Sequence, residues 1–360
     1  MVLVLTPESD GTEPTRSRTE MLLEPKPGGV RRIRLRFLQA AESRRELPEQ
    51  PPDSARPRRA SARSDGGSVS LEPRVVVVTR PSAYRELLDR HGTPGAVRFF
   101  LRDRDPDELA DLQARDDAWR RALDAVVTAV PAGWRLGRAD RADLPAFGFA
   151  PGDVVVAVGP DGLVANVAKY LDDQPVVGVD PAAPGVLARH RLADIPALLA
   201  RLDTAAVEER TTVVAELDDG QRLRGLNEIF IGDRGHQSAR YRLRLPDGRG
   251  EVQSSSGVIV GTGTGATGWC AALARTTAHP PLPHPAEPAL AWFVREAWPG
   301  SGTDLTAGRL DGEERLELTV TSDALVVFSD GGEADRLTAV RGRRVTVGLS
   351  SRRLRLVVPA

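Results

Sequence analysis

The feature that most constrains the fold of this chain is a series of short apolar runs that alternate with helix-like segments. The clearest runs are Arg74-Val75-Val76-Val77-Val78, Asp153–Val158 and Val176–Val179. Such β-branched runs are consistent with strands buried on both faces. The helix-like segments lie near residues 82–92, 105–131, 163–171 and 194–202. Strands that alternate with helices predict an open parallel sheet with helices on both faces.

After Thr211 the pattern changes to short strands joined by tight turns. Asp219-Gly220 and Asp247-Gly248 are hairpin signals, so the second half is predicted to be mainly antiparallel β. Strands are expected at 211–217, 222–231, 239–245, 251–260, 315–320, 324–328, 343–349 and 354–358. We expect two helical interruptions, one starting near Gly265 and one running through Trp292 and Trp298 after the proline-rich stretch 279–288.

The first 71 residues differ from the rest because Pro, Arg, Ser, Glu and Gly dominate them. They lack the apolar surface needed to offset the entropy of ordering, so we expect a disordered extension. An arginine cluster at 31–36 leaves open an anion-binding arm or a targeting peptide. The predicted organisation is therefore a disordered extension at 1–71, an α/β domain at 72–205 and a β-rich domain at 206–360.

Composition narrows the class of protein. The 49 basic and 50 acidic residues nearly balance, which gives no reason to expect a nucleic-acid or membrane partner. The single cysteine, Cys270, excludes an intrachain disulfide and a cysteine-rich metal site. No apolar run approaches the roughly 18 residues needed to span a bilayer. We therefore expect a soluble, cytoplasmic protein.

Three segments carry candidate chemistry. The turn Gly159-Pro160-Asp161-Gly162 leaves the carboxyl end of a predicted parallel strand, where ligands bind in such sheets. Its glycines permit close approach, and the following helix N-terminus attracts anions. On spacing alone, an ordinary tight turn remains the commoner reading.

The second segment, Ser254 to Trp269, runs from a strand through a loop of Gly and Thr into a helix. Its N–H groups and hydroxyls suit a bound anion, although a flexible connector is the alternative. The third is Asn227-Glu228 on an apolar strand, which could bind a ribose or a base edge or could simply face water. His190, His236 and Arg80 are weaker polar candidates.

Taken together and in order, these segments resemble the NAD kinase family over about 74–359. That family carries a Gly-Gly-Asp-Gly turn, an Asn-Glu pair, a Thr-Pro-Thr-Gly-Ser-Thr-Ala-Tyr loop and a final Asp-Gly. The counterparts here are 158–162, 227–228, 262–269 and Asp330-Gly331, and 175–187 resembles the strand and glycine turn that follow the first motif. The chain departs at Pro160, Leu163, Gly263 and Trp269, which indicates a divergent branch.

The resemblance implies an active site in the cleft between the α/β and β-rich domains. It implies transfer of the ATP γ-phosphoryl group to the 2′-hydroxyl of the adenosine ribose of NAD(H), with Mg²⁺ bridging the nucleotide phosphates. Asp161 would orient the hydroxyl or accept its proton, and a homo-oligomer is expected. The residues expected to bind nucleotide are Gly159, Gly162, Asn227, Glu228, Thr262, Gly263, Thr264, Gly265, Thr267 and Asp330. No protein-held metal site is expected.

Two other functions compete with this one. Diacylglycerol and sphingosine kinases share the Asp-Gly turn, so a lipid or other small-molecule kinase is the runner-up. Asn227-Glu228 and the threonine loop argue against it. The altered turn motivates the third reading, a non-catalytic nucleotide sensor.

Overall fold

The computed structural model describes residues 18–24, 32–38, 73–300 and 304–359. The chain forms two compact units, residues 1–68 and 69–360. Within the first, strands β1 (Arg18–Glu24) and β2 (Arg32–Leu38) pair antiparallel. The predicted disorder of residues 1–71 otherwise falls outside the described residues, and it stays a prediction.

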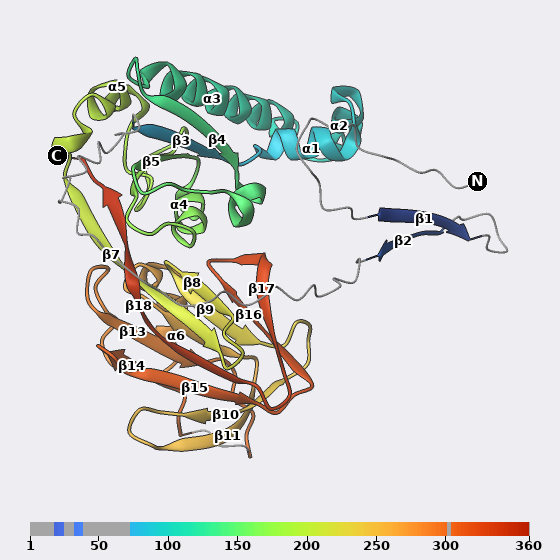
Figure 1. Ribbon diagram of the computed structural model, residues 1–360, viewed down its shortest axis with the longest axis vertical. Coiled ribbons are helices and arrows are strands. Elements are labelled where there is room, and N and C mark those ends of the chain that lie inside the picture. The colour runs from blue at the N-terminus through green and yellow to red at the C-terminus, as the bar shows by residue number, and fades with distance from the viewer. Residues whose placement is uncertain (1–17, 25–31, 39–72, 301–303, 360) are drawn as a thin grey trace, which may run out of the picture. The chain divides into compact units, whose positions relative to one another are not determined.

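The α/β half of the second unit is built on a parallel sheet (Figure 1). Its strands are β3 (Arg74–Thr79), β4 (Arg135–Asp140), β5 (Asp153–Val158) and β6 (Pro175–Val179). They lie in the order β6-β5-β3-β4 and all pair in parallel. Every residue of β5 is buried, as its apolar run predicts. The edge strand β4 has no such run, and the sequence pattern missed it.

Helices cover both faces of this sheet, which confirms the predicted fold class. On one face α3 (Glu108–Ala129) and α5 (Ile195–Leu199) bury Val126 and Leu199 against β3 and β5. On the other face, α4 (Asp161–Ala168) buries Leu163 and Val167. Helix α1 (Ala83–His91) begins where the Ser82 hydroxyl accepts the Arg85 N–H, and it ends at Gly92 with φ 80°. Helix α2 (Pro94–Leu101) packs beside α1.

The β-rich half consists of two sheets around a common core, in which Tyr241, Trp292 and Leu318 are buried. One sheet has the order β14-β13-β12-β9-β16-β17 and is wholly antiparallel. Its strands are β9 (Glu228–Gly232), β12 (Val258–Gly261), β13 (Ala289–Val294), β14 (Ala307–Asp311), β16 (Ala324–Ser329) and β17 (Gly332–Val340). The other contains β7 (Val207–Leu217), β8 (Arg222–Gly225), β10 (Ala239–Arg244), β11 (Gly250–Ser255), β15 (Arg315–Val320) and β18 (Arg344–Val357).

Strand β18 joins the two halves. Its first part pairs antiparallel with β15, and most of its length pairs antiparallel with β7. Its last part pairs in parallel with β6, where Arg355 lies opposite Pro175 and Leu356 opposite Val176. The parallel sheet and one sheet of the β-rich half are therefore a single continuous sheet of ten strands.

Three predictions about elements in the β-rich half were wrong. The strands expected at 343–349 and 354–358 are the single strand β18, which has a bulge between Leu349 and Arg353. No helix runs through Trp292 and Trp298: Trp292 lies on the strand β13, whose six residues are all buried between neighbouring strands, and Trp298 lies beyond its end. A six-residue apolar run is compatible with a helix or a strand. Hydrogen bonding to a neighbouring strand on each side makes this segment a strand. The expected strands 222–231 and 251–260 are each two strands, interrupted at Leu226-Asn227 and at Ser256-Gly257. None of the helices in the described part of the chain is long and apolar enough to cross a membrane.

Candidate active site

Asp161 is the first residue of α4 and lies just beyond the carboxyl end of β5. Its carboxylate accepts three backbone hydrogen bonds. Oδ2 accepts the Val186 N–H at 2.8 Å, and Oδ1 accepts the N–H groups of Leu187 at 2.9 Å and Ala188 at 2.8 Å. The side chain is therefore fixed, and one lone-pair position on Oδ2 is left for another donor.

Gly185 makes this arrangement possible. A Cβ at position 185 would lie 2.2 Å from Asp161 Oδ1, so any side chain would displace the carboxylate. The segment 185–188 follows β6 and therefore reaches the same edge of the parallel sheet as Asp161. Position 185 therefore requires glycine as long as Asp161 keeps this conformation.

Asn227 and Glu228 lie where β8 gives way to β9, and Asp330 holds this turn. The Asp330 carboxylate accepts the backbone N–H groups of Leu226 at 2.8 Å, Asn227 at 2.6 Å and Glu228 at 3.3 Å. Burial raises the pKa of Asp330 to about 6, although these hydrogen bonds and Lys169 favour its charged form. Asp330 therefore positions the backbone that carries the Asn227 and Glu228 side chains.

The threonine loop is organised around its own first residue. The Thr262 hydroxyl donates to the Leu226 carbonyl at 2.6 Å and accepts the N–H groups of Thr264 and Gly265. A Cβ on Gly263 would lie 2.0 Å from the His284 carbonyl oxygen, and one on Gly265 would lie 2.2 Å from that of Asn227. These glycines therefore serve close backbone packing. The N–H groups of Thr264 and Gly265 already bond within the loop, which differs from the expected phosphate cradle.

A pocket of about 260 Å³ brings the turn, the Asn-Glu pair and the threonine loop together. Seven of the predicted site residues line it: Asp161, Gly162, Asn227, Glu228, Thr264, Gly265 and Thr267. Gly159, Thr262, Gly263 and Asp330 do not. Gly159 instead lines a second pocket of about 590 Å³ beside Arg80 and Trp119, also at the carboxyl edge of the parallel sheet. Thr264 is 3% exposed but still contributes to the wall of the first pocket.

The charge of the 260 Å³ pocket is negative. Asp161 and Glu228 both line it, and no Lys or Arg does among the residues that the structure describes. Burial, reinforced by the nearby Asp330, raises the pKa of Glu228 to about 7. A polyanion bound here would be repelled by Asp161, and by Glu228 when it is ionised, so the lining fits an anion that brings a cation such as Mg²⁺ with it.

Sequence reasoning missed Arg210, a buried cation behind this pocket. It lies on β7, pairs with Glu208 at 3.0 Å and approaches the Thr264 hydroxyl at 3.5 Å. Burial lowers the pKa of Arg210, whereas the negative charge of Asp161 is among the effects that raise it. An arginine that follows Glu208 and Glu209 on a strand with mixed polar and apolar residues gives no sequence signal of such a place. Trp269 also lines the pocket and stacks on Phe230 with the ring centroids 5.7 Å apart.

The weaker candidates lie elsewhere. His190 is buried, and its Nε2 lies 3.0 Å from the Val357 carbonyl oxygen, which is a structural contact. His236 is exposed on the loop after β9. Arg80 lines the second pocket and pairs with Glu86 at 3.6 Å.

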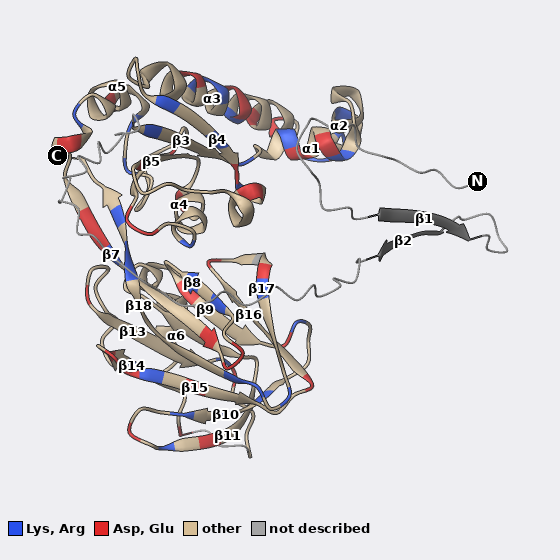
Figure 2. Cartoon of the chain, viewed as in Figure 1, with Lys and Arg blue, Asp and Glu red and all other residues tan. Residues whose placement is uncertain are grey.

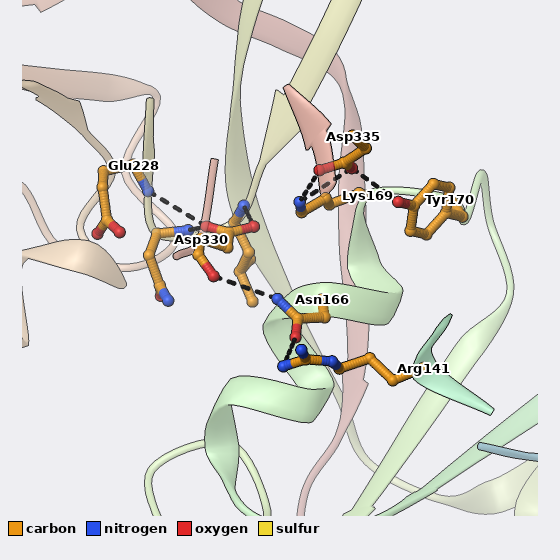
Figure 3. Close-up of polar contacts among 9 residues, drawn as sticks. Arg141, Asn166, Lys169, Tyr170, Glu228, Asp330 and Asp335 are labelled. Atoms are coloured by element: carbon orange, nitrogen blue, oxygen red, sulfur yellow. Dashed lines mark hydrogen bonds and ion pairs between the residues drawn. The ribbon is translucent and has the colours of Figure 1, made fainter. Parts of the chain in front are cut away.

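Polar contacts tie α4 to β16 and β17 of the β-rich half (Figure 3). Lys169, at the end of α4, lies 3.1 Å from Asp335 Oδ2, and the Tyr170 hydroxyl donates to the same oxygen at 2.7 Å. We call Lys169, Tyr170 and Asp335 the latch. Asn166 adds a hydrogen bond to the Asp330 carbonyl at 3.2 Å. The helix that begins with Asp161 is thus fastened to the half that carries Asn227 and Glu228.

These features place a carboxylate at the mouth of a parallel sheet and a threonine loop from the β-rich half in one pocket. No family model matches the chain. In sequence it is similar to NAD kinases from Clostridium botulinum, 28% identical over 127 residues, and Clostridium kluyveri, 26% over 139 residues. These matches cover 32% and 36% of this chain, and 44% and 49% of the relatives. The chain is thus similar to NAD kinases over about a third of its length, and the aligned region spans less than half of each of these two relatives.

A third relative, the NAD kinase of Thermomicrobium roseum, is 27% identical over 126 residues, which is 33% of this chain and 44% of that protein. Among solved structures, an NAD kinase from Archaeoglobus fulgidus in complex with ATP aligns with a TM-score of 0.49 and 17% identity. That alignment covers 79% of this chain and 93% of the other.

Proposed function

We propose that this protein is an ATP-dependent kinase that phosphorylates the 2′-hydroxyl of the adenosine ribose of NAD(H). The observation that carries the proposal is the single pocket that collects Asp161, Asn227, Glu228 and Thr264 from distant parts of the chain. The similarity to NAD kinases supports this choice of acceptor. Cytoplasmic location and a homo-oligomeric state are part of the same proposal.

The roles of the residues follow from their contacts. The free lone pair of Asp161 Oδ2 would accept the hydrogen bond of the acceptor hydroxyl and orient it for in-line attack. Phosphoryl transfer passes through a loose transition state, so holding the hydroxyl in place matters more than removing its proton early. Glu228 and Asn227 would bind the ribose and base of the acceptor, and Trp269 offers an aromatic surface to a base.

The second pocket suits the phosphoryl donor. It opens at the same sheet edge and is lined by Gly159 and Pro160, which directly precede Asp161. Arg80 and Arg115 would contact phosphates there, although Asp111 and Asp180 balance their charge within the lining, and Trp119 supplies an apolar wall. Mg²⁺ bound to the nucleotide would neutralise charge that develops between donor and acceptor.

Asp161→Asn tests the proposal. The amide cannot accept a proton and places a donor beside at least one of the three backbone N–H groups, so we expect kcat to fall by roughly 10² to 10⁴-fold. The assay incubates labelled ATP and Mg²⁺ with NAD, NADH or diacylglycerol and identifies the labelled product. The matched control is Asp247→Asn, which makes the same change at an exposed turn carboxylate outside the pocket and should leave kcat unchanged. Unchanged turnover in Asp161→Asn would remove Asp161 from the mechanism.

The same assay decides between the competing functions. Label in diacylglycerol would support the lipid kinase. Nucleotide binding without a labelled product from any acceptor would support the sensor, for which Pro160 in the turn is the motivating departure.

A further inference from the structure

A third pocket, of about 520 Å³, lies behind the latch and shares no residue with the candidate active site. The C-terminal end of α4 forms one wall through Lys169 and Tyr170. Strands β7, β8, β15 and β18 form the others. Nothing in the proposed reaction uses this cavity.

The lining of this pocket is strongly basic. Its five basic side chains are Lys169, Arg222, Arg224, Arg315 and Arg352, against the three carboxylates of Asp172, Glu216 and Asp335. The basic residues of β8 and β18 can be followed in Figure 2. The surplus of two positive charges contrasts with the acidic lining of the candidate active site. A cavity of this charge attracts an anion.

Arg222 is paired with Glu216 at 2.9 Å, whereas the carboxylate beside Arg224 and Arg352 lies farther away. Asp172 lies 3.7 Å from Arg224 and 3.5 Å from Arg352, so one exposed carboxylate is shared at long range between two arginines. Burial lowers the pKa of Arg224 because the charged guanidinium group is partly removed from water. Arg315 is exposed and turned toward this cavity.

The backbone is shaped to present these groups. Strand β18 carries a bulge against β7 between Leu349 and Arg353, which places Ser350, Ser351 and Arg352 in the pocket wall. Gly348 lies just before the bulge, and a Cβ there would come within 2.4 Å of Arg315 Cδ. The stem of Arg315 therefore lies flat across β18 only because residue 348 is glycine. Hydroxyl groups and planar guanidinium groups together suit phosphate oxygens.

We propose that this pocket binds a small phosphate-bearing anion, either free or as part of a larger metabolite, and that its occupancy is transmitted to Asp161 through α4. Lys169 and Asp335 belong both to the pocket wall and to the latch. An anion that attracts Lys169 competes with Asp335 and loosens the attachment of α4 to β17. Binding of the anion does not depend on the proposed kinase function, whereas the effect of the bound anion on turnover rests on that function.

Isothermal titration of the full chain with pyrophosphate, and separately with ADP, tests the binding. Arg315→Ala with Arg352→Ala should weaken pyrophosphate binding at least tenfold, or about 1.4 kcal/mol. The matched control replaces two exposed arginines elsewhere, Arg249→Ala with Arg341→Ala, and should leave the affinity unchanged. Circular dichroism verifies that both variants fold. Absence of binding, or equal affinity in the two double variants, would overturn the proposal. Tighter binding of ADP that persists in Arg315→Ala with Arg352→Ala would assign the nucleotide to another site.

Kinase assays with and without pyrophosphate test the coupling. We expect pyrophosphate to change kcat in the natural chain and in the control variant, and to have no effect in Arg315→Ala with Arg352→Ala. If pyrophosphate binds but kcat is unchanged, the proposed transmission to Asp161 is refuted, while the anion-binding site itself stands. If no acceptor is phosphorylated at all, the kinase proposal fails while the titration still decides the anion site.

Discussion

The latch offers the sharpest test of how the two halves are held together. In Lys169→Met the Asp335 carboxylate keeps only the Tyr170 hydroxyl among its latch partners. The side chains of Lys169 and Asp335 are 5% and 17% exposed, so this ion pair is close to a buried one. Removing one partner of such a pair costs about 3 to 5 kcal/mol, and the partial exposure of Asp335 favours the lower value. We expect the free energy of unfolding to fall by about 3 kcal/mol.

Chemical denaturation measures this loss, and thermal unfolding should show a Tm lower by at least about 6 °C, at roughly 2 °C per kcal/mol for a domain of this size. The matched control is Arg341→Met. It breaks an ion pair at 2.7 Å whose side chains are 64% and 98% exposed, and it should cost less than about 1 kcal/mol.

Asp335→Leu added to Lys169→Met removes the stranded carboxylate and should recover much of the stability. If Lys169→Met were no more destabilising than Arg341→Met, the latch would be an ordinary surface contact. Its proposed part in positioning Asp161 would then lose its basis.

Three further predictions concern the site. Burial raises the pKa of Glu228 to about 7, so the contribution of this carboxyl group to stability is present below about pH 4.5 and is lost as the pH rises through 7. The Tm of Glu228→Gln should therefore rise relative to that of the natural chain between pH 4.5 and pH 8. An equal Tm difference at both pH values would contradict this. Gly185→Ala places a methyl group against Asp161 and should abolish phosphoryl transfer, whereas Gly148→Ala, with nothing within 4 Å of the added carbon, should not. Burial raises the pKa of Cys270 to about 12, so iodoacetamide at pH 8 should label it only after denaturation, and rapid labelling of the folded protein would refute its enclosure.

Prediction from the sequence was most accurate for elements that are determined by residues close together in the chain. Strands such as β5 were evident because five consecutive residues, Val154 to Val158, are apolar and the whole strand is buried. The cap at Ser82 and the end at Gly92 followed from the same kind of local chemistry. The six apolar residues of β13 were misread as helix because their pairing with β12 and β14 lies outside any local window.

The candidate site was recoverable only in part. Asp161, Asn227, Glu228 and Thr264 were visible as motif residues, and the fold brings them to one pocket. The break between β8 and β9 was not predictable, because Asp330 imposes it from a hundred residues away. The pair of Lys169 with Asp335 spans 166 residues and has no sequence pattern of its own. Arg210 was hidden because nothing along β7 marks which side chain faces the threonine loop.

Strand β18 has a consequence for biogenesis. Its residues 344–357 supply a neighbour to β6 in one half and to β7 and β15 in the other. Neither half can complete its hydrogen bonding on the ribosome until these residues have emerged, so the usual order of one domain maturing before the next is unavailable here. Until then β6 and β15 each have an open edge, and the nascent chain depends on late closure to avoid pairing with other chains.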